Sequence, residues 1–302
     1  MIPPIVAGAS RLGSVLPDGL AGRSRRQREL RTLDTLLESG CTAFDLAASY
    51  QLGGTERLFG EWLESRRLRD RVFLVGKGGH PYPVVRPNRL TAAALSEDLE
   101  SSLRRLRIER FDLYLLHRDF PAAPLEPLVQ TLAAAHRAGK FAAWGVSNWN
   151  VARIEALQAA ARAGGLPPMA ASSPHLSVVD WVRAPWTGSV SIAGRAGRDA
   201  RAFHARTRLP VLAWSPLGGG FLTSDAQGGC YGGSANVARR DRARALARER
   251  GWTVAQVALA YLFSQPFPVS AVVAASTGEK MRENVAAAGF RLTAREVEAL
   301  EQ

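Results

Sequence analysis

Four ionisable side chains lie at or just after short apolar segments in the first half of the sequence. They are Asp45, Tyr50, Lys77 and His117. A phenol alone is a poor proton donor and acceptor at neutral pH, because its pKa is about 10. A neighbouring ammonium is expected to lower that pKa, and a carboxylate to hold the ammonium charged and in place. An imidazole opposite them can orient a carbonyl oxygen. Together these groups predict a proton donor for a carbonyl compound.

The sequence offers no pattern for the other common kinds of catalysis. It contains no pairing of a nucleophile with a base, no metal-ligating cluster and no pair of carboxylates, so we predict no metal site. A proton donor without a nucleophile fits carbonyl reduction, in which a cofactor supplies the hydride. Each of the four residues also has an ordinary structural interpretation, such as a rim tyrosine or a helix-capping aspartate. Their joint position at three consecutive strand ends favours the catalytic interpretation.

Apolar segments alternate with amphipathic segments along nearly the whole chain. The predicted strands are short and mostly lack polar alternation, which is typical of a parallel sheet buried on both faces. They span residues 5–7, 43–46, 72–75, 113–116, 142–146, 169–172, 211–214 and 271–274. The predicted helices span residues 27–37, 55–62, 91–106, 125–138, 151–163, 253–263 and 280–288.

About eight strand–helix units without a separating linker predict one (β/α)8 TIM barrel over residues 1–302, as a single domain. A doubly wound sheet is the alternative. Its phosphate-binding turn is G-x-G-x-x-G after the first strand, whereas here the first strand runs into Gly8–Gly13, which has a different pattern. In a barrel, catalytic side chains project from the C-terminal ends of the strands, which is where the four residues fall.

Six short motifs resemble those of the aldo-keto reductases, in the family's order and over almost the whole chain. They are Asp45–Tyr50 with Gly53, Glu56 and Gly60, then Val75–Lys77, Ser102–His117, Gly139–Asn148, Trp214–Gly218 and Lys280–Asn284. The resemblance implies that Tyr50 protonates the carbonyl oxygen while a nicotinamide hydride reaches the carbonyl carbon. It also implies that Lys77, paired with Asp45, tunes Tyr50. His117 would orient the carbonyl.

The resemblance further implies a cofactor site along the same strand ends. Ser147 and Asn148 would hydrogen-bond the nicotinamide carboxamide, and Trp214 would lie against the ring. Lys280 and the following Glu-Asn pair would hold the adenosine end. The complete predicted set is Ser147, Asn148, Ser173, Trp214, Ser215, Leu217, Gly218, Ser276, Thr277, Lys280, Glu283 and Asn284.

Two departures from the family pattern affect this cofactor site. A glutamine usually follows the sixth strand, and here Ser173 stands in for it, with His175 nearby. After the eighth strand only the hydroxyls of Ser276 and Thr277 are present, which leaves Lys280 as the main cation. A lysine with two hydroxyls suits a 2′-phosphate better than a bare ribose hydroxyl, so NADPH is predicted over NADH.

The predicted partner is a small-molecule aldehyde or ketone, including a keto sugar or a pathway intermediate. The residues expected around the pocket are partly aromatic, which fits such compounds. They are Leu52, His80, Tyr82, Trp149, Trp181 and Phe221. Because the chain ends soon after Glu301, we expect no long C-terminal substrate loop and an open pocket. The alternative function is a cofactor-binding regulatory subunit resembling potassium-channel β subunits, which the intact four-residue group disfavours.

Two segments near the predicted site stay open to two interpretations. The loop that carries Trp181 and Trp186 is either a local satellite core or a substrate lid. The Gly-rich stretch Gly218–Gly233 is either a surface loop or a loop that folds over the cofactor pyrophosphate. The sequence does not decide between them.

The composition is that of an ordinary globular protein, with 46% hydrophobic and 22% charged residues among 302. Two cysteines cannot form a disulfide framework, so a reducing cytoplasm is expected. No apolar run of about 18 residues occurs, so we predict no membrane partner. The net charge of +12 comes from arginine runs interrupted at helical spacing. Such runs favour solvated helix faces over a nucleic-acid groove. The oligomeric state is left open.

Overall fold

Eight parallel strands close into a barrel in the computed structural model, which describes residues 1–15, 20–81, 88–225, 228–275 and 277–302. The strands are β1 (Ile5–Gly8), β2 (Ala43–Asp45), β3 (Phe73–Gly78), β4 (Phe111–Leu116), β5 (Phe141–Ser147), β6 (Ala171–Ser173), β7 (Val211–Trp214) and β8 (Val269–Val273). Each strand pairs with the next one along the chain, and β8 pairs with β1. The predicted (β/α)8 barrel is confirmed.

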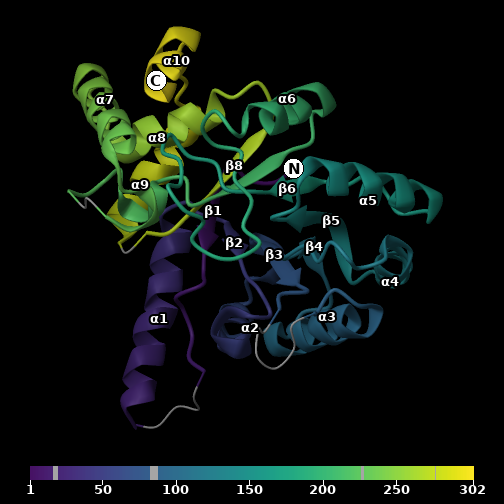
Figure 1. Cartoon of the computed structure of the whole chain (residues 1–302). Helices are drawn as coiled ribbons and strands as arrows, with labels where there is room; N and C mark the ends of the chain where they lie inside the picture. The colour runs from purple at the N-terminus through teal and green to yellow at the C-terminus, as the bar shows by residue number, and fades with distance from the viewer. Residues whose placement is uncertain (16–19, 82–87, 226–227, 276) are drawn as a thin grey trace.

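The helices surround the barrel, as Figure 1 shows. They are α1 (Leu20–Glu38), α2 (Gly54–Arg66), α3 (Ala92–Leu106), α4 (Leu125–Arg137), α5 (Val151–Ala163), α6 (Arg198–Thr207), α7 (Ser234–Arg250), α8 (Val254–Phe263), α9 (Gly278–Ala286) and α10 (Ala294–Glu301). The predicted helix list lacked α6, α7 and α10. On α7 the buried side chains are Asn236, Arg240 and two alanines, so the apolar stripe that marks an amphipathic helix is weak.

The core has two layers, because successive residues of a strand point to opposite faces of the sheet. One buried cluster fills the barrel interior with Val6, Ala43, Val75, Leu113, Leu115, Ala171 and Leu212. The residues between them, such as Phe44 and Tyr114, belong to the larger cluster between the barrel and its helices. Inward-facing side chains therefore occur at every second strand residue. Counting on in steps of two towards the C-terminal ends of the strands gives the side chains that face the open end of the barrel.

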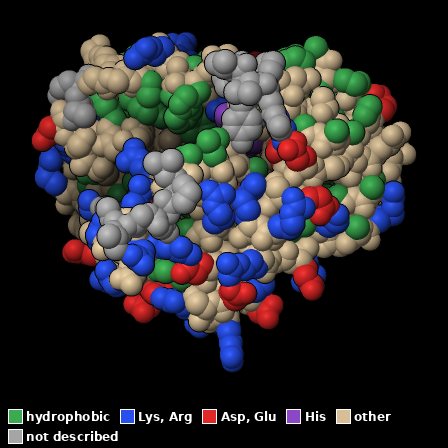
Figure 2. Space-filling view, turned by 90° about the horizontal axis from the view of Figure 1, so that it is seen from below, with side chains coloured by type: hydrophobic (Ala, Val, Ile, Leu, Met, Phe, Trp, Pro, Cys, Tyr) green, Lys and Arg blue, Asp and Glu red, His purple; other side chains and the backbone are tan. Residues whose placement is uncertain are grey.

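Most of the arginine-rich segments form exposed helix faces, as the helical spacing predicted. Exposed examples are Arg23, Arg28, Arg104, Arg198, Arg206 and Arg248. Figure 2 shows one face of the molecule on which Lys and Arg side chains gather around a hollow, with fewer Asp and Glu among them. Within the described ranges, no helix is long and apolar enough to cross a membrane.

Gly145 of β5 offers a test of how tightly the barrel wall is packed. A methyl group on its Cα would collide with the carbonyl oxygen of Ala171 on the neighbouring strand and touch the Leu115 side chain. We expect Gly145→Ala to lower the free energy of unfolding by about 1–3 kcal/mol, the usual cost of overpacking a core.

The matched control is Gly289→Ala, because a methyl group there meets no atom within 4 Å and its backbone does not have a positive φ. We expect a change of less than about 0.5 kcal/mol for this variant. Urea unfolding followed by circular dichroism measures both. Equal stabilities of the two variants would show that the strand contact is looser than described.

Candidate active site

The alternation of the strands delivers the predicted catalytic side chains to one place. Asp45 is two residues after the inward Ala43, Lys77 two residues after Val75, and His117 two residues after Leu115. In the strand register Asp45 lies opposite Val75, and Lys77 lies opposite Leu115. Each of the three side chains therefore points into the barrel at its C-terminal end.

The four residues form one contact group. The Lys77 Nζ donates to Asp45 Oδ1 at 2.5 Å and to the carbonyl oxygen of Leu46 at 3.0 Å. It lies 4.9 Å from the centroid of the Tyr50 ring. The Tyr50 hydroxyl is 3.4 Å from Asp45 Oδ2. The rings of Tyr50 and His117 meet edge to face with their centroids 5.9 Å apart. The structure thus brings together the phenol, ammonium, carboxylate and imidazole that the sequence singled out.

The proton affinities of the pair differ in part from the sequence expectation. Burial raises the pKa of the Tyr50 phenol, and the Asp45 carboxylate raises it further, while the Lys77 ammonium lowers it. The net pKa lies above its ordinary value. The Lys77 ammonium therefore acts in the predicted direction, but the loss of hydration of the phenolate outweighs it. Burial lowers the pKa of Lys77, but Asp45 and Tyr50 raise it more, so the ammonium stays charged.

His117 is a buried, neutral imidazole. Burial lowers its pKa well below the ordinary value, and the positive charges of Lys77 and Arg118 lower it further. The ring of His80 lies 4.7 Å from it, centroid to centroid. Among the described residues no group hydrogen-bonds its buried Nδ1. A neutral ring carries one N–H, and a buried lone pair costs less than a buried unpaired N–H, so the proton belongs on Nε2.

Comparison with known proteins identifies the arrangement. The family model described as Aldo/keto reductase family matches residues 4–302. The chain belongs to this family. The uncharacterized oxidoreductase Rv2298 of Mycobacterium tuberculosis is 31% identical over 284 residues, which cover 86% of this chain and 77% of that protein. Aldo-keto reductases are oxidoreductases that use NAD(P)H, and this chain is one of them.

Two solved structures share the whole barrel. The thermostable aldo-keto reductase Tm1743, in complex with the inhibitor epalrestat, has a TM-score of 0.78 and 26% identity, with 99% of this chain and 94% of that chain covered. An aldo/keto reductase from Klebsiella pneumoniae, in complex with NADP and acetate, has a TM-score of 0.75 and 27% identity over 99% and 90% of the two chains.

In this aldo-keto reductase, the three residues predicted to contact the nicotinamide carboxamide form a hydrogen-bonded row. Asn148 Nδ2 donates to Ser147 Oγ at 2.9 Å, and Ser147 Oγ donates to the Ser173 carbonyl at 3.0 Å. Ser173 Oγ donates to the carbonyl of Leu212 at 2.8 Å. Its hydroxyl proton is used, but its lone pairs can still accept from an amide N–H. Asn148 is held from the other side, since its Oδ1 accepts from the Val190 backbone at 3.2 Å.

An aromatic cluster surrounds Trp214 at the end of β7. The His175 and Trp181 rings lie 5.1 and 5.6 Å from the Trp214 ring, and the Trp186 ring lies 5.9 Å away. Trp181 is half-buried and packs against the core, whereas Trp186 is 60% exposed. One tryptophan of this loop therefore supports Trp214, and the other lies open at the surface next to it.

His175 connects the two loops beside this cluster. Its Nδ1 is 2.8 Å from Ser191 Oγ, and its Nε2 is 3.1 Å from the Tyr231 hydroxyl. Tyr231 lies in the Gly-rich stretch 218–233, so the described parts of that stretch are anchored on the loop that carries Ser191. The turn after Trp214 is tight, with Ser215 and Gly218 at positive φ and the Ser215 carbonyl accepting from the Gly218 N–H. Leu217 is half-buried against the core.

The residues predicted for the adenosine end lie at the start of α9. Thr277 caps the helix, since its Oγ1 accepts from the Lys280 backbone N–H at 3.3 Å. Lys280 is exposed, Glu283 half-buried and Asn284 buried. Ser276 lies outside the described residues, as does Tyr82 of the predicted pocket.

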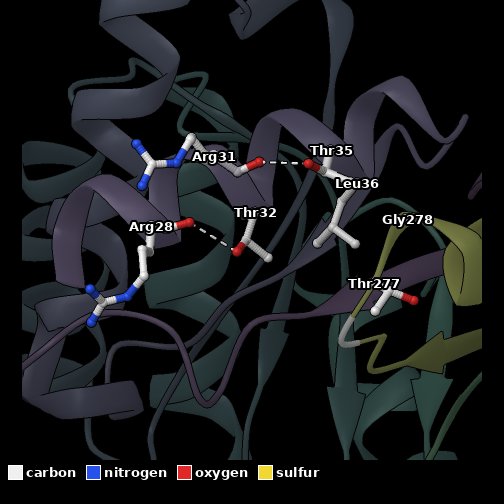
Figure 3. A pocket seen from close by; sticks show the side chains of 7 residues that line it. All are labelled: Arg28, Arg31, Thr32, Thr35, Leu36, Thr277 and Gly278. Atoms are coloured by element: carbon white, nitrogen blue, oxygen red, sulfur yellow. Dashed lines mark hydrogen bonds between the residues drawn. The ribbon is translucent and has the colours of Figure 1, made fainter. Parts of the chain in front are cut away.

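A pocket of about 280 Å³ opens between α1 and the start of α9 (Figure 3). Arg28 and Arg31 line one side and Thr277 the other. Figure 3 shows both guanidinium groups turned to the side opposite Thr277. They add positive potential near the predicted adenosine site, while Lys280 stays its predicted cation.

Two residues at this site were not among the predicted site residues. Arg118 directly follows His117, and His175 connects the loops beside Trp214. A charge at the end of an apolar strand was a signal for Arg118. Nothing in the sequence shows that His175 reaches Ser191 and Tyr231. Among the described residues, no group of three or more His, Cys, Asp or Glu could hold a metal ion.

The buried His175 predicts a stability that depends on pH. Burial lowers its pKa to about 3. Below pH 6.5 the unfolded chain therefore takes up a proton that the folded protein does not hold, so stability is full above that pH and falls on acidification. Between pH 7 and pH 5 this residue alone removes about 2 kcal/mol from the free energy of unfolding.

Urea unfolding at pH 5, 6 and 7 measures the effect in wild type and in His175→Gln. We expect the variant to lose about 2 kcal/mol less than wild type over this range. His136→Gln, a half-buried histidine on α4, is the control and should follow wild type. The same dependence on pH in wild type and His175→Gln would contradict the claim that the buried His175 causes the loss of stability.

Proposed function

We propose that this protein reduces an aldehyde or ketone to the alcohol with NADPH, using Asp45, Tyr50, Lys77 and His117. The observation that carries the proposal is the buried contact between Lys77 Nζ and Asp45 Oδ1, at 2.5 Å, directly beside the Tyr50 ring. A charged ammonium in this position has no evident use for the fold. It favours the phenolate that remains after Tyr50 gives up its proton.

Tyr50 is the proton donor in this scheme. Its raised pKa keeps the hydroxyl protonated at neutral pH, which is the state that a reduction needs. As the carbonyl oxygen becomes an alkoxide, it takes the Tyr50 proton, and the phenolate is left next to the Lys77 ammonium. Asp45 keeps that ammonium in place and charged. The reduced nicotinamide, when bound, supplies the hydride.

His117 orients the substrate. A neutral imidazole with its proton on Nε2 can donate one hydrogen bond to the carbonyl oxygen and carries no charge of its own. Such a donor polarises the carbonyl without offering a second strong acid that would compete with Tyr50.

The residues present fit a phosphorylated nicotinamide cofactor. Ser173 keeps its acceptor lone pairs, and the Trp214 ring is held by its aromatic neighbours at the end of β7. Lys280 at the first turn of α9 combines a side-chain cation with a helix N-terminus, which suits a phosphate. The Klebsiella relative was solved with NADP, which supports the same choice.

Replacement of the proton donor tests the enzyme proposal. We expect Tyr50→Phe to lower kcat for carbonyl reduction by about 10²–10⁴-fold, the usual contribution of a positioned acid. Its Kd for NADPH, measured by protein fluorescence, should stay that of wild type. Tyr114→Phe is the control, because among the described residues no group hydrogen-bonds that buried hydroxyl. Rates for Tyr50→Phe equal to those of wild type on every carbonyl tested would refute the role of Tyr50.

Replacement of the predicted phosphate ligand tests the cofactor choice. We expect Lys280→Met to weaken NADPH binding by about tenfold, because one charged hydrogen bond is lost, and to leave NADH binding unchanged. Arg295→Met on α10 removes the same charge from an exposed site and serves as the control. Equal losses for both cofactors, or tighter NADH binding by wild type, would overturn the preference for NADPH.

A further inference from the structure

Arg118 is a mostly buried cation beside the proposed catalytic group. It directly follows His117 and is 9% exposed. Its Nη1 donates to the Gly188 carbonyl and to Ser189 Oγ, both at 3.1 Å. Both acceptors are neutral, and no acidic side chain among the described residues pairs with it. A guanidinium buried this far normally has a carboxylate or phosphate partner, because its loss of hydration is otherwise poorly compensated.

The nearby acids are each bound to a different cation. Asp45 pairs with Lys77. Asp98 accepts from Arg89 and from the backbone of Gly79. Asp119, which directly follows Arg118, is held by Arg153 at 3.0 Å.

The charge of Arg118 acts on the titratable groups of the proposed active site. It lowers the pKa of His117 and of His80, and the charge of the Tyr50 phenolate in turn stabilises the guanidinium. The Asp45–Lys77 pair is neutral as a unit, and both histidines have lowered pKa values. The proposed substrate end of the site therefore has a net charge of about +1. The reduced nicotinamide ring is uncharged, and the cofactor's phosphates are expected near Lys280. A negative charge to pair with Arg118 would therefore come from the substrate.

We propose that the physiological substrate of this protein is a short carbonyl compound with an anionic oxygen group, a carboxylate or a phosphate, and that Arg118 binds this group. The inference rests on the proposed reductase function and names its substrate class. Arg118 directly follows His117, and its charge acts on both His117 and Tyr50, so an anionic group bound to it would lie close to the reacting carbonyl. The planar guanidinium keeps donors that its two neutral partners do not use, and these match two oxygens of one anionic group.

Matched substrate pairs test this selectivity on the NADPH-loaded enzyme. One pair is 4-oxobutanoate and its methyl ester, and the other is glyceraldehyde 3-phosphate and glyceraldehyde. For wild type we expect a higher kcat/KM for the anionic member of at least one pair, and the preferred pair tells carboxylate from phosphate. In Arg118→Met that preference should fall by about ten- to a hundredfold, as for the loss of a charged hydrogen bond.

Three further variants separate direct binding from other effects. Arg118→Lys keeps the positive charge but loses the paired N–H donors of the guanidinium, so it should show a preference for the anionic member between those of Arg118→Met and wild type. Ser189→Ala removes one bond that holds Arg118 and should leave the preference near that of wild type. Arg195→Met removes an exposed charge from the same loop as Ser189 and should behave as wild type, which excludes long-range attraction alone.

A binding measurement covers the case in which turnover is slow. Calorimetric titration of the enzyme–NADP⁺ complex with 4-hydroxybutanoate, the alcohol product, should show binding to wild type that is about tenfold weaker in Arg118→Met. Equal kcat/KM for anionic and neutral members in wild type would overturn the inference and leave the reductase function standing. Equal losses for both members in Arg118→Met, with weaker NADPH binding, would assign Arg118 to the cofactor and also overturn it. Absence of turnover of every carbonyl would instead contradict the proposed function.

Discussion

The ion pair of Lys77 and Asp45 inside the barrel is the interaction on which the site depends. Both side chains are almost fully buried, so each has lost the hydration of its charge. Such a pair adds little to folding stability compared with apolar residues of similar size, and the loss of one partner alone is strongly destabilising. The pair is tolerated here because Lys77 also bonds the Leu46 carbonyl and faces the Tyr50 ring.

The Tyr50 phenol shows how two opposing effects combine at such a site. An ammonium at this distance stabilises a phenolate, and this was the basis of the expectation of a lowered pKa. The phenolate also loses hydration when the ring packs against His117 and the barrel wall, and this effect is larger. The result is a phenol that stays protonated, next to a cation that becomes favourable as the proton leaves. For a reduction, this combination is better than a phenolate in the resting state.

The sequence predicted the barrel because short apolar segments alternate with helical ones, and it placed Asp45, Lys77 and His117 because each lies at the end of such a segment. The inward side chains Ala43, Val75 and Leu115 belong to apolar runs that are visible in the sequence. The polar residue two positions further along each run could therefore be placed by counting. The helices α6, α7 and α10 escaped prediction for the opposite reason. The buried face of α7 carries alanines and the polar Asn236 and Arg240, so no apolar period stands out.

The parts of the site that the sequence did not predict are contacts between loops that are far apart in the chain. Arg118 meets residues some seventy positions later, and His175, just after β6, contacts Tyr231 in the stretch after β7. No local pattern encodes such contacts, because they depend on how neighbouring loops lean over the barrel mouth. These same loops decide which substrate enters, while the strand ends decide what happens to it. The reaction class of this protein could therefore be predicted largely from residues at the strand ends, whereas the substrate class that we propose rests on a loop residue, Arg118.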